Sequence, residues 1–199
     1  MEPTADDVDA IRELINIGVG RAAGMLNDIT SCSISLEIPS IQIVDFVHLS
    51  QAKCAGKDTA LSTVSLNFRG PMSGLAALVL PPESAAHLVM LMTRENEDAG
   101  ELDAIRIETL REVGNIIING VMGSIANVLQ QHLSYSLPTY QELGISALAG
   151  AVHARIDDRL VIANAHFRIE ETPVDGDILL ILEMGSMDAL LARIHDMDR

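Results

Sequence analysis

The sequence predicts an α+β fold: a pseudo-twofold duplicated domain with a mostly antiparallel sheet and two long, symmetry-related helices. Each half of the chain opens with apolar residues at helical spacing, short strand-like runs follow, and the second half repeats features of the first. We therefore expect one domain over residues 1–199, made of two repeats at about 4–92 and 101–195 with an acidic connector at 93–100.

The repeat is visible when the sequence is shifted against itself. A shift of 99 residues superposes residues 12–17 on 111–116, Gly24 on Gly123 and Pro39 on Pro138. A shift of 102 superposes residues 74–80 on 176–182, which places a three-residue difference in an intervening loop. Two homologous halves follow from this pattern.

The first element of each half is predicted to be a long helix. Thr4 and Asp7 have the spacing of a capping box at the start of the first helix. The residues expected to form its buried stripe are Ile11, Leu14, Ile15, Gly18, Ala22, Met25 and Leu26. The corresponding stripe of the second helix is Ile105, Val113, Ile116, Ile117, Gly120, Val121, Ser124, Ile125 and Val128.

Strands are expected after each helix. Residues 33–38 alternate with period two, and we expect this strand to end at Pro39. One hairpin is predicted in each half: 63–68 with 75–80 around a turn at 70–74, and 161–169 with 178–182 around a turn at 173–176. Ser84 and Ser186 then suit the N-caps of short closing helices.

Composition narrows the classes of partner. The formal net charge of −15 disfavours binding to nucleic acid or to anionic membranes, and the aromatic content of 3% leaves few platforms for stacking bases or sugars. The apolar stretch 113–129 contains three asparagines and is expected to be a buried helix. Two cysteines without a CxxC pattern and an acidic N-terminal stretch favour a cytoplasmic protein. A protein partner is the expectation.

A polar stripe on each long helix is the candidate site. Asp9, Glu13 and Asn16 lie at i, i+4 and i+7 and share one helix face, opposite the apolar stripe. Glu108, Glu112 and Asn115 repeat these steps in the second helix, and Asn119 lies one turn further. An isolated glutamate is an ordinary surface residue, whereas asparagine is disfavoured inside helices.

The spacing of the stripe is more specific than its residue types. Both halves contain Glu, two residues, Asn, twenty-two residues and Pro, ending at Pro39 and Pro138. Duplication alone explains the second copy if ancestral residues persisted. The halves have otherwise diverged heavily, however, and this favours a functional role for the stripe.

The stripe resembles the signature of the CheC/CheX/FliY phosphatases of bacterial and archaeal chemotaxis, which have Asp or Ser, then Glu, Asn and Pro at these intervals. The first copy fits throughout, and the second departs only where Glu108 replaces Asp or Ser. Two intact copies resemble two-site CheC more than CheX, which has one site per chain and dimerises. FliY-type proteins usually carry an added flagellar-switch domain.

The resemblance implies a substrate and a mechanism. The substrate would be the aspartyl phosphate of a CheY-like response regulator, whose receiver domain holds its own Mg²⁺ and an active-site lysine. Asn16 and Asn115 would position the attacking water, and Glu13 and Glu112 would pair with the receiver lysine. The chain would need no cofactor or metal of its own, and we expect it to be a monomer.

Two further hypotheses stay open. The chain could be a non-catalytic adaptor or response-regulator-binding protein in chemotaxis or another two-component system. CheC proteins also often bind the receptor deamidase CheD through an acidic residue in the segment that corresponds to residues 140–147, where Glu142 is the one acidic residue.

The six histidines are scattered without metal-binding spacing. Gly20, Gly24, Gly120 and Gly123 are expected to allow close packing of helices or strands.

Overall fold

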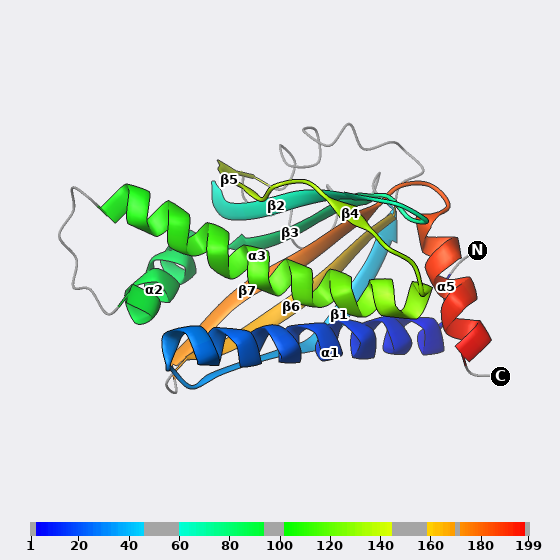
Figure 1. Cartoon of the computed structure of the whole chain (residues 1–199), viewed down its shortest axis with the longest axis horizontal. Helices are drawn as coiled ribbons and strands as arrows, with labels where there is room; N and C mark the ends of the chain where they lie inside the picture. The colour runs from blue at the N-terminus through cyan, green and yellow to red at the C-terminus, as the bar shows by residue number, and fades with distance from the viewer. Residues whose placement is uncertain (1–2, 46–59, 94–101, 145–158, 170–171, 198–199) are drawn as a thin grey trace.

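The computed structural model describes residues 3–45, 60–93, 102–144, 159–169 and 172–197. Its helices are α1 (Ala5–Thr30), α2 (Pro82–Thr93), α3 (Leu102–Leu129) and α5 (Ser186–Met197). Its strands are β1 (Ile34–Asp45), β2 (Leu61–Arg69), β3 (Gly74–Leu80), β4 (Ser134–Tyr135), β5 (Thr139–Leu143), β6 (Arg159–Ile169) and β7 (Thr172–Leu182). The expected α+β fold, with an antiparallel sheet and two long helices packed together, is confirmed (Figure 1).

The sheet interleaves strands from the two ends of the chain. Its order is β1-β6-β7-β3-β2, with β4 and β5 both pairing with β2 at the far edge, and every pairing is antiparallel. In the central pair of strands, Leu75 lies opposite Ile181 and Val79 opposite Asp177. A shift of 102 residues superposes Leu75 on Asp177 and Val79 on Ile181. The internal repeat therefore relates one of these pairs to the other.

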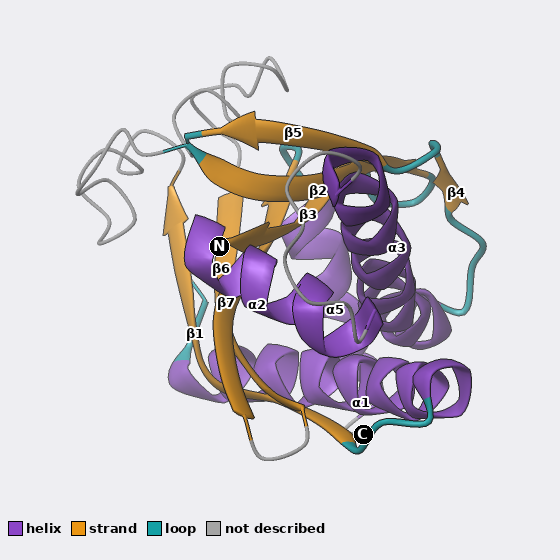
Figure 2. Cartoon of the chain, turned by 90° about the vertical axis from the view of Figure 1, so that its left-hand side faces the viewer, coloured by secondary structure: helices purple, strands orange, loops and turns teal. Residues whose placement is uncertain are grey.

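The two long helices lie side by side and antiparallel on one face of the sheet (Figures 1 and 2). Their backbones are in close contact at Gly18 and Gly120. A Cβ atom added to Gly18 would lie 2.6 Å from the Cα atom of Val121, and one added to Gly120 would lie 2.6 Å from the carbonyl oxygen of Gly18. Only glycine permits this backbone-to-backbone contact, which fixes the register of one helix against the other.

The close packing expected of four glycines holds for Gly120 alone. A Cβ atom added to Gly20, Gly24 or Gly123 would meet no atom within 4 Å. Gly18, which was expected only in the buried stripe, makes the close contact instead.

The remaining core also departs from the sequence expectations in places. The apolar stripes are buried as predicted except for Met25 and Ile105, which are exposed, and Gly120 and Val128, which are half-buried. The long helix α3 meets a length and hydropathy criterion for membrane spans, but more than half of that stretch is buried inside the protein. This confirms the expectation of a buried helix at 113–129.

Several element boundaries differ from the predictions. Strand β1 does not end at Pro39 but continues to Asp45, with a register shift between Glu37 and Ser40. Proline is tolerated there because β1 is an edge strand and the irregularity removes one ladder position. Residues 173–176 belong to β7 and not to a turn, since β6 and β7 pair as far as Ile169 and Thr172.

The two predicted serine caps are also different in the structure. Ser84 lies inside α2, which begins two residues earlier at Pro82, a residue suited to the first helical position. Ser186 begins α5, but its hydroxyl donates to the carbonyl oxygen of Ser73 and accepts from the Ser73 amide. It therefore joins α5 to the turn before β3. The Thr4–Asp7 capping box of α1 forms as predicted.

Candidate functional site

In the polar stripe of each long helix, the acidic side chains are exposed to solvent and the asparagine of the motif is half-buried. Glu13 and Glu112 are both exposed, on α1 and α3. Within the described parts of the chain, neither carboxylate has a hydrogen bond or an ion pair. Both carboxylates are thus free to meet a cationic group on another molecule.

The first position of each motif copy is engaged inside its own helix. Asp9 pairs with Arg12 at 3.0 Å, and Glu108 pairs with Arg111 at 3.0 Å. The shift of 99 residues carries one pair onto the other. The replacement of Asp or Ser by Glu at position 108 therefore preserves the local ion pair, which is solvent-exposed and contributes little to stability.

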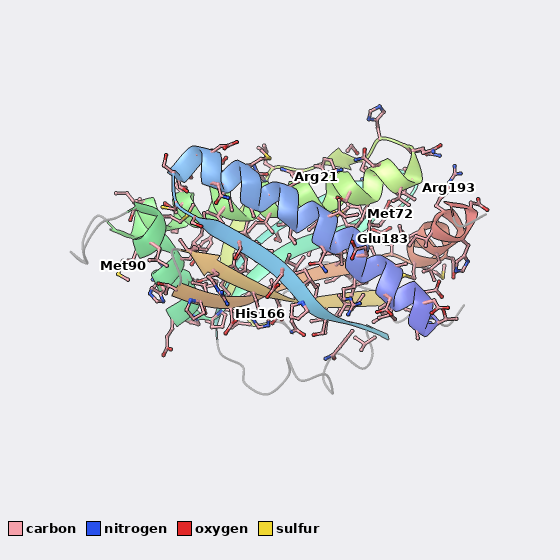
Figure 3. The ribbon with its side chains drawn as sticks, turned by 90° about the horizontal axis from the view of Figure 1, so that it is seen from below. Arg21, Met72, Met90, His166, Glu183 and Arg193 are labelled. Atoms are coloured by element: carbon pink, nitrogen blue, oxygen red, sulfur yellow. The ribbon has the colours of Figure 1, made fainter. Side chains whose placement is uncertain are left out.

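Asn16 is attached to the sheet by both ends of its carboxamide. Its Oδ1 accepts from the amide of Ile38 at 2.8 Å, and its Nδ2 donates to the carbonyl oxygen of the same residue at 3.1 Å. Ile38 immediately precedes Pro39 in β1, at the irregularity where the strand slips against β6. The twenty-two-residue spacing from Asn16 to Pro39 thus has a direct structural basis. Figure 3 shows α1 and β1 side by side.

Asn115 has a different set of contacts. Its Oδ1 accepts from Nδ2 of Asn119 at 2.7 Å, one turn further along α3. A backbone bond to Leu137, the residue equivalent to Ile38, is not found in the described structure. Leu137 is 84% exposed, whereas Ile38 is 2% exposed. Ser136 still bonds to Asn67 of β2, and Leu137 and Pro138 then form the irregularity between β4 and β5.

The surroundings of Asn115 still place it near the far edge of the sheet. The neighbouring Gly114 packs so closely on β2 that an added Cβ atom would lie 2.6 Å from the Cβ atom of Val64. Val64 is paired with Tyr140 of the edge strand β5. The second Glu/Asn pair therefore lies on the helix over the β2–β5 edge, while the first lies beside β1 at the opposite edge.

The helix contact gives the separation of the two pairs. Gly18 lies against Gly120 in antiparallel helices, so Asn16 and Asn115 are two and five residues from this point in opposite directions. At 1.5 Å per residue, the asparagines are roughly 10 Å apart along the axes and the glutamates roughly 20 Å. The structure thus does not bring the four predicted residues into one cluster; it forms two separate pairs.

Sequence reasoning missed the backbone partner of Asn16. The available signal was the interval between Asn16 and Pro39, which recurs between Asn115 and Pro138. Pro39 is exposed and follows Ile38, the backbone partner of Asn16, whereas Pro138 is half-buried and follows Leu137, which has no described bond to Asn115.

Other predicted features have limited structural counterparts. Among the described residues, no group of three histidine, cysteine, aspartate or glutamate side chains is arranged to hold a metal ion. Glu142 is exposed on β5 and accepts a hydrogen bond from the Tyr140 hydroxyl at 2.9 Å. Residues 145–147 of the segment considered for CheD, and 94–100 of the connector, lie outside the described residues.

Comparison with known proteins identifies related sequences. No family model matches the chain. The chain is 25% identical over 137 residues to the CheY-P phosphatase CheC of Bacillus subtilis, and 28% identical over 137 residues to a putative CheY-P phosphatase, CheC1, of Halobacterium salinarum. These matches cover 67% and 66% of this chain. It is also 22% identical over 199 residues to the flagellar motor switch phosphatase FliY of B. subtilis.

The matched regions are only part of these relatives. They span 65% of the length of the B. subtilis CheC, 66% of CheC1 and 51% of FliY. The chain therefore matches just under two thirds of the first two proteins and about half of the third.

Solved structures share the fold over nearly the whole chain. FliY of Thermotoga maritima superposes with a TM-score of 0.77 at 19% identity, covering 98% of this chain and 99% of that one. The CheX–CheY–BeF₃–Mg²⁺ complex of Borrelia burgdorferi contains a chain with a TM-score of 0.54 at 15% identity, covering 88% and 99%. The sequence matches and the shared fold agree with the twice-repeated Glu/Asn motif, and the chain is similar to proteins of the CheC/CheX/FliY family.

Proposed function

We propose that the chain accelerates hydrolysis of the aspartyl phosphate on a CheY-like response regulator. The observation that carries the proposal is an exposed carboxylate with a carboxamide one helical turn away, present on both α1 and α3. The relatives named CheY-P phosphatases support the reaction class. The fold relative solved together with CheY, BeF₃ and Mg²⁺ supports the kind of partner.

The chemistry needs few groups from this chain. An acyl phosphate is intrinsically reactive, so catalysis consists mainly of placing a water molecule in line with the phosphorus atom. A carboxamide oxygen has two acceptor sites, and its nitrogen carries two hydrogens. Asn16 uses one of each on Ile38, which leaves one acceptor site and one N–H group for a water molecule. Asn115 retains one acceptor site and both N–H groups within the described structure.

The glutamates are suited to docking. Glu13 and Glu112 are exposed and lie one turn before their asparagines, so each can pair with a lysine beside the phosphoaspartate while the asparagine reaches the water. The Mg²⁺ that neutralises the phosphoryl oxygens belongs to the receiver domain. The chain itself would position the attacking water through its asparagines and supply the negative charge of its glutamates.

The test uses the two glutamates, because their side chains can be removed without breaking a hydrogen bond or an ion pair of the described structure. Glu13→Ala combined with Glu112→Ala should abolish the acceleration of phosphate loss from a phosphorylated receiver. Asp28→Ala combined with Glu83→Ala removes the same charge from exposed positions elsewhere and should leave the acceleration intact. Decay at the spontaneous rate with the unmodified chain would contradict the proposal and favour a non-catalytic adaptor.

Asn16→Ala combined with Asn115→Ala distinguishes catalysis from binding. If the asparagines position water, this variant should still bind a BeF₃-activated receiver but should no longer shorten the lifetime of its phosphate. Circular dichroism and thermal unfolding establish that the variant is folded before its activity is compared.

A further inference from the structure

The two asparagines share one contact despite their different surroundings. In each, Oδ1 accepts a single fixed hydrogen bond: from the Ile38 amide at 2.8 Å for Asn16, and from Nδ2 of Asn119 at 2.7 Å for Asn115. A carboxamide can rotate by half a turn and exchange its oxygen and nitrogen, and a donor fixed on the oxygen removes this freedom.

The two halves of the chain differ at the position one turn after the asparagine. The shift of 99 residues that superposes Asn16 on Asn115 superposes Gly20 on Asn119. In the first half the backbone of β1 supplies the donor, and no side chain is needed at position 20. In the second half the equivalent residue, Leu137, is 84% exposed and makes no described bond to Asn115, and the donor comes from the helix itself.

We infer that Asn119 is a positioning residue of the second site, which replaces the strand amide and fixes the orientation of the Asn115 carboxamide. The inference rests on the proposed function, since its consequence is a faster phosphatase reaction at that site. Asn119 is exposed and mid-helix, where asparagine is otherwise disfavoured relative to good helix formers. Its side chain bonds to Asn115 and to no other described side chain.

The experiment isolates the second site. Glu13→Ala disables docking at the first site without touching α3 and serves as the parent protein for all further variants. In this parent, Asn119→Ala should lower the maximal rate of receiver dephosphorylation by about two- to tenfold, the effect of losing one orienting hydrogen bond. The concentration of receiver needed for half-maximal rate should stay unchanged, because Glu112 still docks it.

Asn119→Asp separates orientation from space filling. Aspartate has the same shape as asparagine but cannot donate, so it would accept from Nδ2 of Asn115 and hold the carboxamide the opposite way round. Its rate should be at least as low as that of Asn119→Ala. A rate equal to that of the parent would overturn the inference, because a role in packing would tolerate this change.

A double-mutant cycle tests whether Asn119 acts through Asn115. In the Glu13→Ala parent with Asn115→Ala added, Asn119→Ala should cause no further loss. A further loss of the same size would overturn the inference and assign Asn119 a contact of its own with the receiver.

The outcomes distinguish this inference from the proposed function. If the unmodified chain does not accelerate dephosphorylation, both fail. If the unmodified chain accelerates dephosphorylation, two results make the inference alone fail. One is an inactive Glu13→Ala parent, and the other is a rate for both Asn119→Ala and Asn119→Asp that equals the rate of this parent. Unchanged unfolding temperatures for the position-119 variants exclude a loss of folding as the cause.

Discussion

Asn16 and Ile38, twenty-two residues apart, are joined by two hydrogen bonds that use both ends of the asparagine carboxamide and both polar groups of the Ile38 backbone. This contact ties the middle of α1 to an edge strand at the point where its register slips. The same side chain is the proposed water-positioning group of the first site. Asn16 therefore combines a structural role with the proposed catalytic one, whereas Asn115 lacks the strand contact in the described structure.

Alanine substitutions should expose this difference as an asymmetry in stability. Asn16→Ala leaves the amide and carbonyl of the buried Ile38 without partners and should lower the free energy of unfolding by about 1–3 kcal/mol. Asn115→Ala removes one exposed hydrogen bond and should change it by about 0.5 kcal/mol or less. Urea unfolding of the two variants checks this, and equal losses would contradict the assigned contacts.

The glycines of the long helices should divide into two classes. Gly18→Ala or Gly120→Ala would push a methyl group into the backbone of the neighbouring helix, and should destabilise the protein by about 1–3 kcal/mol. Gly24→Ala and Gly123→Ala are matched controls, since a Cβ atom meets open space at both positions. These should stabilise by about 0.5–1 kcal/mol through helix propensity. Thermal unfolding of the four variants measures the division, and a uniform effect would contradict the close helix contact at Gly18 and Gly120.

Acid should weaken the capping box at the start of α1 and the contact of α5 with it. The Asp7 carboxylate accepts from the Thr4 amide and hydroxyl and contacts Nε2 of His195 at 2.6 Å. The backbone bond from Thr4 is the largest cause that lowers the pKa of Asp7 below its ordinary value of 3.8; burial opposes it, and the Thr4 hydroxyl and His195 reinforce it. Because the pKa is lower in the folded state, the stabilisation is present above pH 3.8 and is lost as the pH falls through the folded value.

Asp7→Asn tests this pH dependence. At neutral pH the variant should unfold at a lower temperature than the unmodified chain, and the difference should shrink as the pH falls below 3.8. Asp6→Asn, at the exposed neighbour in the same helical turn, is the control and should have a much smaller effect. A difference that stays constant from neutral to acid pH would show that the Asp7 charge does not contribute.

Receiver binding should depend on salt through the two exposed glutamates. If Glu13 and Glu112 pair with a lysine of the receiver, added salt should weaken binding of a BeF₃-activated receiver to the unmodified chain. Glu13→Gln combined with Glu112→Gln should bind more weakly at low salt and show a smaller dependence on salt. Titration calorimetry at two salt concentrations measures both quantities, and an unchanged salt dependence would place the lysine contact elsewhere.

Much of the fold followed from local patterns in the sequence. The capping box at Thr4 and Asp7, the helical spacing of the apolar residues and the hairpin of β2 and β3 depend on neighbours within a few residues, which the sequence displays directly. The errors arose where distant contacts override local preference. The edge position of β1 lets it continue through Pro39, and Ser186 bonds to Ser73 instead of capping its own helix.

The candidate site divides in the same way. The sequence by itself determined that each long helix carries a glutamate and an asparagine one turn apart, because helical geometry fixes which residues are neighbours. The expectation that both face solvent holds for the glutamates, whereas the asparagines are half-buried. Only the tertiary structure decided that Asn16 is bound by the backbone of β1 while Asn115 is bound by Asn119. The reason is that a contact between a helix and a strand depends on packing: Ile38 and Leu137 both lie at an irregularity of an edge strand, but Ile38 is buried and Leu137 is 84% exposed.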